Sequence, residues 1–148
     1  MRNEHVFLSY CHDNTVLATR LHDALERAGE VVCWDRDFTV GPDWKDQRDK
    51  ALDCAYAMVL CWSKQAASRT ESGVYPELRD AIERLRDMRP GECYILPVRL
   101  NKADLPRLRI DATTKVNQLQ YVDLFPATKW ALGVQRVLES LRASARHP

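Results

Sequence analysis

The feature that most constrains the fold is the unbroken apolar run AMVLCW at residues 57–62. A strand with one wet face alternates apolar and polar residues, whereas a strand covered on both faces is apolar throughout. The run therefore predicts a central strand of a parallel sheet with helices packed on both of its faces.

Four further stretches have the length and composition of strands, at residues 6–9, 31–34, 94–98 and 119–122. Pro97 lies in one of them, and proline has no N–H to give to a neighbouring strand. We therefore expect Pro97 near the end of its strand or on a side that is not paired.

Stretches with apolar residues at helical spacing alternate with the strands, at residues 13–28, 44–54, 75–88 and 127–143. Asp13 or Asn14 is a candidate cap for the first helix, and Gly29 is placed to end it. Residues 101–118 are polar and irregular and predict no element. The alternation indicates one α/β domain with a parallel sheet and right-handed crossovers, a fitting size for 148 residues.

Composition narrows the function classes. The formal net charge is +1 and the sequence pI is about 7.7, which argues against direct nucleic-acid binding. The sequence shows neither a signal peptide nor an apolar run long enough for a membrane span, so we expect a cytoplasmic protein. Its five cysteines are odd in number and form no CxxC pair, which favours reduced structural cysteines.

Ligands of open α/β sheets bind beyond the carboxyl ends of the strands. The loop that follows the first strand there has no glycine, which excludes a GxGxxG turn and a Walker loop. No His/Cys cluster has metal-ligand spacing, so we expect neither a metal nor a bound cofactor. Cys11 and His12 are adjacent and remain a minor candidate for a nucleophile pair.

Four segments, in this order and spacing, resemble the sequence boxes of bacterial-type Toll/interleukin-1 receptor (TIR) domains. They are HVFLSY at residues 5–10, the acidic loop with glycine and tryptophan at 35–44, VLCWS at 59–63 and SGVYPEL at 72–78. The resemblance covers about residues 5–125. It implies a single TIR domain over residues 1–148, with its core at about 5–143. The implied fold is a flavodoxin-like three-layer sandwich with a five-stranded parallel sheet in the order 2-1-3-4-5.

The resemblance also implies a chemistry, cleavage of NAD+ between nicotinamide and ribose to give ADP-ribose or a cyclic isomer. Glu77 matches the catalytic glutamate of the family. A carboxylate can stabilise the oxocarbenium-like ribose, and nicotinamide leaves neutral, so no strong general acid is needed. Glu77 also has a plain structural interpretation, because a carboxylate is favoured in the first turn of a helix. Gly73 stands where enzymatic members often have a tryptophan.

The candidate substrate-binding residues flank the expected cleft: Ser9, Tyr10, Asp35, Asp37, Phe38, Trp44, Ser63 and Tyr75. Ser9 and Tyr10 are candidates for contacts with nicotinamide or ribose, and the two aspartates for ribose hydroxyls. Each also has a structural alternative as a strand-end, solvated loop or packing residue.

Three functions stay open on the sequence alone. The first is a TIR NAD+ nucleosidase of immune or stress signalling, activated when other TIR domains or an associated sensor assemble it. The second is a non-catalytic TIR–TIR interaction module that docks through residues 35–44. The third is a flavodoxin-like nucleotide enzyme of another kind, such as a nucleoside transferase with a glutamate nucleophile.

Overall fold

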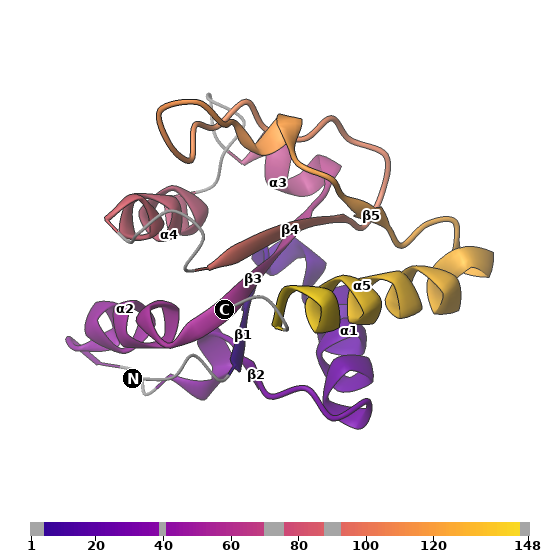
Figure 1. Cartoon of the computed structure of the whole chain (residues 1–148), viewed down its shortest axis with the longest axis horizontal. Coiled ribbons are helices and arrows are strands. Elements are labelled where there is room, and N and C mark those ends of the chain that lie inside the picture. Colours follow the sequence, from indigo (N-terminus) through magenta and orange to yellow (C-terminus); the bar gives the residue numbers. More distant parts are fainter. Residues whose placement is uncertain (1–4, 39–40, 70–75, 88–92, 146–148) are drawn as a thin grey trace.

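The computed structural model describes residues 5–38, 41–69, 76–87 and 93–145. Its centre is a five-stranded, all-parallel sheet in the order β2-β1-β3-β4-β5 (Figure 1). The strands are β1 His5–Ser9, β2 Val32–Cys33, β3 Ala55–Trp62, β4 Tyr94–Arg99 and β5 Val122–Asp123. The predicted fold class and strand order are confirmed.

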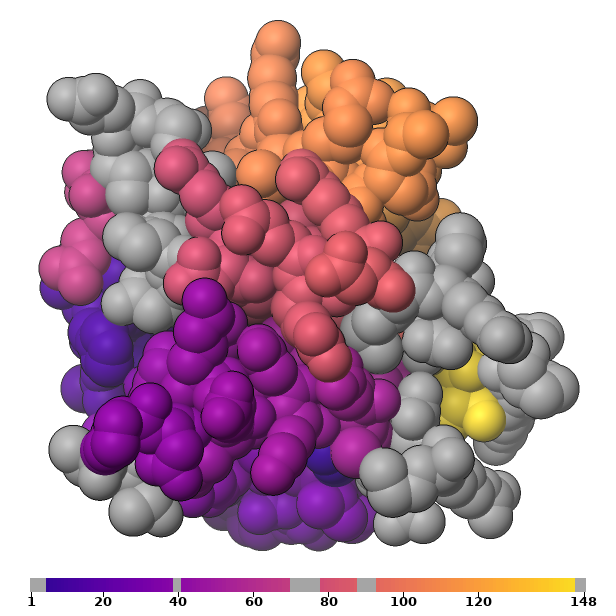
Figure 2. Space-filling model, turned by 90° about the vertical axis from the view of Figure 1, so that its left-hand side faces the viewer, coloured from indigo at the N-terminus to yellow at the C-terminus, as the bar shows by residue number. Residues whose placement is uncertain are grey.

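Helices cover both faces of the sheet, with α1 and α5 on one face and α2, α3 and α4 on the other (Figure 1). They are α1 Thr15–Arg27, α2 Trp44–Asp53, α3 Lys64–Ser68, α4 Pro76–Arg86 and α5 Trp130–Ala145. Short 3-10 helices precede or connect them: η1 His12–Asn14, η2 Asp35–Asp37, η3 Val116–Gln118 and η4 Ala127–Lys129. Figure 2 shows α2 and α4 side by side on the second face.

The side chains of β3 explain the apolar run that predicted it. Alternate residues, Val59 and Cys61 among them, pack with α1 and α5, whereas Met58, Leu60 and Trp62 pack with α2 and α4. All five are buried. Both faces of the strand thus lie in apolar layers, and no position is left for a polar side chain.

Pro97 lies inside β4 but outside one of its two ladders. It is in register with Leu60 of β3, whereas the ladder to β5 pairs only Val98 with Val122 and Arg99 with Asp123. The side of β4 that faces β5 is therefore unpaired at the proline, as its missing N–H requires.

The fifth strand was predicted too early in the sequence. Leu119 packs against the apolar layer beneath α2 and α4 after η3, and the strand begins only at Val122. The apolar pattern there reports packing of an irregular segment rather than strand pairing. After β5, the chain at Leu124 packs closely against Gly133 of α5, where an added Cβ would lie 2.6 Å from Leu124 Cδ2.

Two further local expectations are corrected. Asn14 occupies the N-cap position of α1 but makes no side-chain capping bond within the described residues. Its amide instead accepts a bond from Ser63 Oγ and donates one to Gln65. The short helix α3 was not predicted, because its five residues follow β3 directly. Gly29, with φ of +98°, ends α1 as expected.

In the part of the chain that the structure describes, no helix is long and apolar enough to cross a membrane.

Candidate active-site cleft

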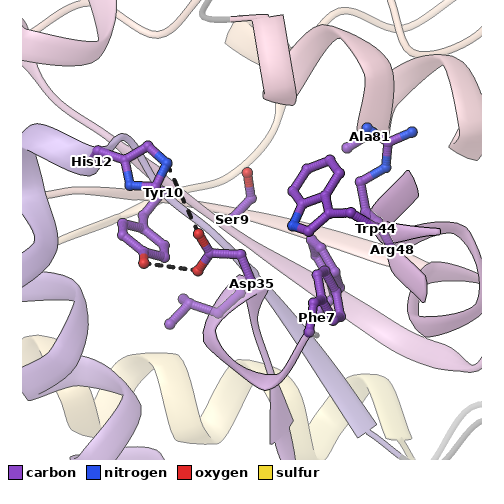
Figure 3. A pocket seen from close by; sticks show the side chains of 10 residues that line it. Phe7, Ser9, Tyr10, His12, Asp35, Trp44, Arg48 and Ala81 are labelled. Carbon is purple, nitrogen blue, oxygen red and sulfur yellow. Dashed lines mark hydrogen bonds and ion pairs between the residues drawn. The ribbon is translucent and has the colours of Figure 1, made fainter. Parts of the chain in front are cut away.

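A cleft opens beyond the carboxyl ends of β1 and β2, beside the point where the strand order reverses between β1 and β3 (Figure 3). Its volume is about 490 Å³, including the part open to solvent. The lining residues come from β1, η1, η2 and the following loop, α2 and α4: Phe7, Leu8, Ser9, Tyr10, His12, Asp35, Phe38, Trp44, Arg48 and Ala81.

A polar cluster forms one end of the cleft. Tyr10 Oη donates a 2.8 Å hydrogen bond to Asp35 Oδ1, and His12 Nε2 lies 4.0 Å from Asp35 Oδ2 (Figure 3). Burial, followed by the hydrogen bond and the charge of Asp35, raises the pKa of Tyr10 from 10.0 to about 12. The phenol is therefore a neutral hydrogen-bond donor at physiological pH. A carboxylate can accept more than one such bond, so Asp35 can also accept from ligand hydroxyls.

The η2 turn holds Asp35 at this position. Trp34 N–H donates to Asp37 Oδ2 at 3.1 Å, and Asp37 N–H donates back to Trp34 O at 3.0 Å. The Trp34 indole stacks on His22 at 4.1 Å between ring centroids, with the Arg36 guanidinium 5.2 Å from the same indole. The Asp37 carboxylate thus stabilises the turn that presents Asp35, and its contact with ribose stays a prediction.

Aromatic side chains form the wall of the cleft next to this cluster. The Phe38 ring lies 6.5 Å from that of Phe7 in a stacked arrangement and 6.0 Å from that of Trp44 in an edge arrangement. Phe38 also packs against the apolar layer beneath α2 and α4. Such a wall offers flat apolar surfaces to a planar ring. Both Phe38 and Trp44 were candidates from sequence, and both line the cleft.

Two other residues that line the cleft were not among the substrate-binding candidates from sequence. Arg48 lies in a helix whose apolar face is narrow, and arginines in such helices are usually solvated, yet this one is buried. His12 was considered only as a minor nucleophile candidate with Cys11, and it lines the cleft beside Asp35, whereas Cys11 is buried.

Glu77 is the second residue of α4, but its side chain and all of Tyr75 lie outside the described residues. Residue 77 is one helical turn before Ala81, which lines the cleft, and positions four apart share a helix face. The backbone of α4 therefore brings residue 77 to the side of the helix that borders the cleft.

Ser63 is buried at the end of β3 and does not line the cleft described above. Its Oγ donates to Asn14 Oδ1 at 2.5 Å and accepts from Ala66 N–H at 3.0 Å, which caps α3. The hydroxyl thus joins the end of β3 to η1. No group of three or more His, Cys, Asp or Glu side chains among the described residues is arranged to hold a metal ion.

The Tyr10 phenol gives a pH-dependent prediction. Its pKa is raised from 10.0 to about 12 in the folded protein, so the stability that it contributes is complete below pH 10 and is lost as the pH rises to about 12. We expect the free energy of unfolding to fall less steeply in Tyr10→Phe than in the wild type over this range. Urea unfolding at pH 9, 10 and 11 measures both slopes, and equal slopes would contradict the assignment.

The parallel sheet in the order 2-1-3-4-5 and the cleft at its carboxyl edge define an α/β domain of flavodoxin-like topology. Residues 6–138 match the family profile described as TIR domain, and the chain therefore belongs to the TIR domain family. No curated protein sequence matches it significantly.

Solved structures with the same fold come from animals and prokaryotes. The TIR domain of the Toll-related receptor TRR-2 from Hydra magnipapillata is 16% identical with a TM-score of 0.67, and 93% of this chain covers 97% of that one. A metazoan TIR-STING receptor from C. gigas, in complex with 2',3'-cGAMP, is 23% identical with a TM-score of 0.65 over 92% of this chain. This chain spans 40% of that receptor chain. A prokaryotic SEFIR domain is 17% identical, with a TM-score of 0.61 and coverage of 93% and 97%.

Proposed function

We propose that this TIR domain is an NAD+ nucleosidase with Glu77 as its catalytic carboxylate. The observation that carries the proposal is the position of residue 77 on α4, one turn from Ala81 in the cleft wall. The same cleft holds the Tyr10–Asp35 pair and the aromatic wall. Family membership adds support, since the resemblance that identified Glu77 implies this chemistry.

The reaction needs a negative charge near the ribose but no strong general acid. The bond from ribose C1' to the nicotinamide nitrogen breaks, its electron pair goes to that nitrogen, and nicotinamide leaves neutral. The ribose is left as an oxocarbenium-like cation, which the Glu77 carboxylate stabilises until it is attacked. Attack by water gives ADP-ribose, and attack by a nitrogen of the adenine gives a cyclic isomer.

The remaining side chains bind and orient the substrate in this proposal. Tyr10 and Asp35 hold ribose hydroxyls with Ser9 beside them, and Asp37 supports Asp35 from the η2 turn. Phe38 and Trp44 stack on a planar ring of the substrate. Tyr75, two residues before Glu77, is proposed to complete the site, and Ser63 to support it indirectly by joining the end of β3 to η1. The reaction takes NAD+ as a substrate and uses neither a metal nor a bound cofactor.

We also propose that assembly switches the activity on. The partners would be other TIR domains or a sensor that carries them together in the cytoplasm, in immune or stress signalling. The test is nicotinamide release, followed by chromatography, with the protein dilute, concentrated or fused to an oligomerising tether. We expect release to increase per molecule upon tethering, with the co-product showing hydrolysis or cyclisation. Absence of release from tethered protein would reject the enzymatic proposal.

A second candidate is a non-catalytic interaction module, favoured by two of the similar structures being receptors, namely TIR-STING and a Toll-related receptor. Its docking surface would be the loop at residues 35–44. Sedimentation velocity over a broad concentration range, alone and with another TIR domain, tests it. A species that stays monomeric and binds no TIR domain would reject this candidate.

A further inference from the structure

The only charged side chain that is buried among the described residues is that of Arg48, in α2. It is 4% exposed. A buried charge is costly unless it is paired and its hydrogen-bonding groups are satisfied.

Two more exposed arginines have much better partners than Arg48. Arg99, whose side chain is 16% exposed, contacts both Asp123 oxygens at 2.6 and 2.8 Å. Arg84, whose side chain is 37% exposed, contacts both Asp53 oxygens at 3.0 and 2.6 Å. Both pairs have the short, two-point geometry that arginine and a carboxylate prefer.

The bonds of Arg48 are long by comparison. Its Nη1 lies 3.4 Å from Asp80 Oδ2, its Nε lies 3.4 Å from Asp49 Oδ1, and its Nη2 lies 3.1 Å from the same Asp49 oxygen. Hydrogen bonds from N–H to oxygen are usually about 2.7–3.2 Å, so one of the three is of ordinary length. The most buried guanidinium of the three thus has the weakest set of contacts.

Arg48 is also one of the residues that line the cleft. Figure 3 shows its side chain reaching from α2 toward α4, beyond Trp44 and away from the Tyr10–Asp35 pair. Its guanidinium carbon lies 5.6 Å from the Trp44 ring centroid. The lining of the cleft thus includes the Asp35 carboxylate and the Arg48 guanidinium, together with the aromatic side chains of Phe38 and Trp44.

We propose that Arg48 binds the pyrophosphate of the substrate, an inference that rests on the proposed dinucleotide reaction and adds a subsite to it. A planar guanidinium can donate to two phosphate oxygens at once. The contact that Arg48 makes with Asp80 is a single long one, at 3.4 Å. Asp80 lies partly in solvent and can give up its contact. A dinucleotide would then lie across the aromatic wall, with a ribose at Asp35 and its phosphates at Arg48.

The experiment measures the binding of ADP-ribose and of adenosine, which has the same base and a ribose but no phosphate, by NMR titration. The variants are Arg48→Gln, Arg48→Lys and Lys50→Gln, the last removing an exposed cation from the same helix. Thermal unfolding first establishes that each variant folds. We expect Arg48→Gln to weaken ADP-ribose binding roughly ten- to hundredfold and adenosine binding less than twofold. Arg48→Lys should recover part of the loss, and Lys50→Gln should bind as the wild type does.

Three results would overturn the subsite: a wild type that does not bind ADP-ribose, an Arg48→Gln variant that binds it normally, or an equal loss for adenosine. The assay needs no turnover, so it separates this inference from the proposed reaction. A protein that binds ADP-ribose through Arg48 but never releases nicotinamide would reject the reaction and leave the subsite. An active enzyme whose Arg48→Gln variant keeps its affinity would reject the subsite alone.

Discussion

Replacing Trp62 with alanine is expected to lower the free energy of unfolding by about 3–5 kcal/mol. Trp62 ends the central strand β3 and is 1% exposed among side chains of α2, α4 and the neighbouring strands. Its Nε1–H also donates a 2.7 Å hydrogen bond to the Asp104 carbonyl. The substitution therefore leaves a large cavity and removes a buried donor, in a domain whose total stability is of the order of 5–15 kcal/mol.

Two matched variants separate these contributions in urea unfolding. Trp62→Phe keeps most of the apolar volume but leaves the Asp104 carbonyl without its donor, so we expect a smaller loss of about 1–3 kcal/mol. Tyr121→Ala removes an aromatic side chain that is about half exposed, and should cost less than Trp62→Ala. A loss below about 1 kcal/mol for Trp62→Ala would contradict the packing of the central strand.

The sheet could be predicted because its burial leaves a direct trace in the sequence. Residues 57–62 are apolar at every position since both faces of β3 are covered, and the runs of β1, β2 and β4 follow the same logic. The strand order is different in kind. It came from the resemblance to TIR domains, because short apolar runs do not say which strands are neighbours.

The conformation of the irregular segments could not be predicted, because it depends on contacts with residues that are distant in the sequence. The segment at residues 101–118, expected to form no element, contains the short helix η3 and otherwise packs apolar side chains such as Leu105 and Leu108 on the layer beneath α2 and α4. Asparagine is a residue type that often caps helices, but the Asn14 side chain accepts a hydrogen bond from Ser63, 49 positions away, instead. Local preference was overruled there by a tertiary contact.

The candidate site was likewise predictable only in part. That Tyr10 and Asp35 lie at one edge of the sheet follows from parallel topology, since both come after strand ends. Their hydrogen bond, and the burial of Arg48, depend on side-chain geometry that no sequence pattern specifies. Glu77 was singled out by resemblance alone, and its catalytic role is a proposal.

Replacing Glu77 with glutamine is expected to lower the rate of nicotinamide release at least about hundredfold, because the neutral amide cannot stabilise a cationic ribose. Glutamine has nearly the same size and the same helix propensity, so the fold should be unaffected. Glu83→Gln is the matched control, since it removes an exposed carboxylate from the same helix. ADP-ribose binding should persist in both variants, which would separate a loss of chemistry from a loss of the cleft.

The most direct test is the initial rate of nicotinamide release from NAD+ by tethered wild-type, Glu77→Gln and Glu83→Gln proteins at equal concentration. We expect similar release by the wild type and Glu83→Gln, and at least about hundredfold less by Glu77→Gln. Equal release by Glu77→Gln would contradict the role of the glutamate. No release by the tethered wild type would contradict the reaction itself.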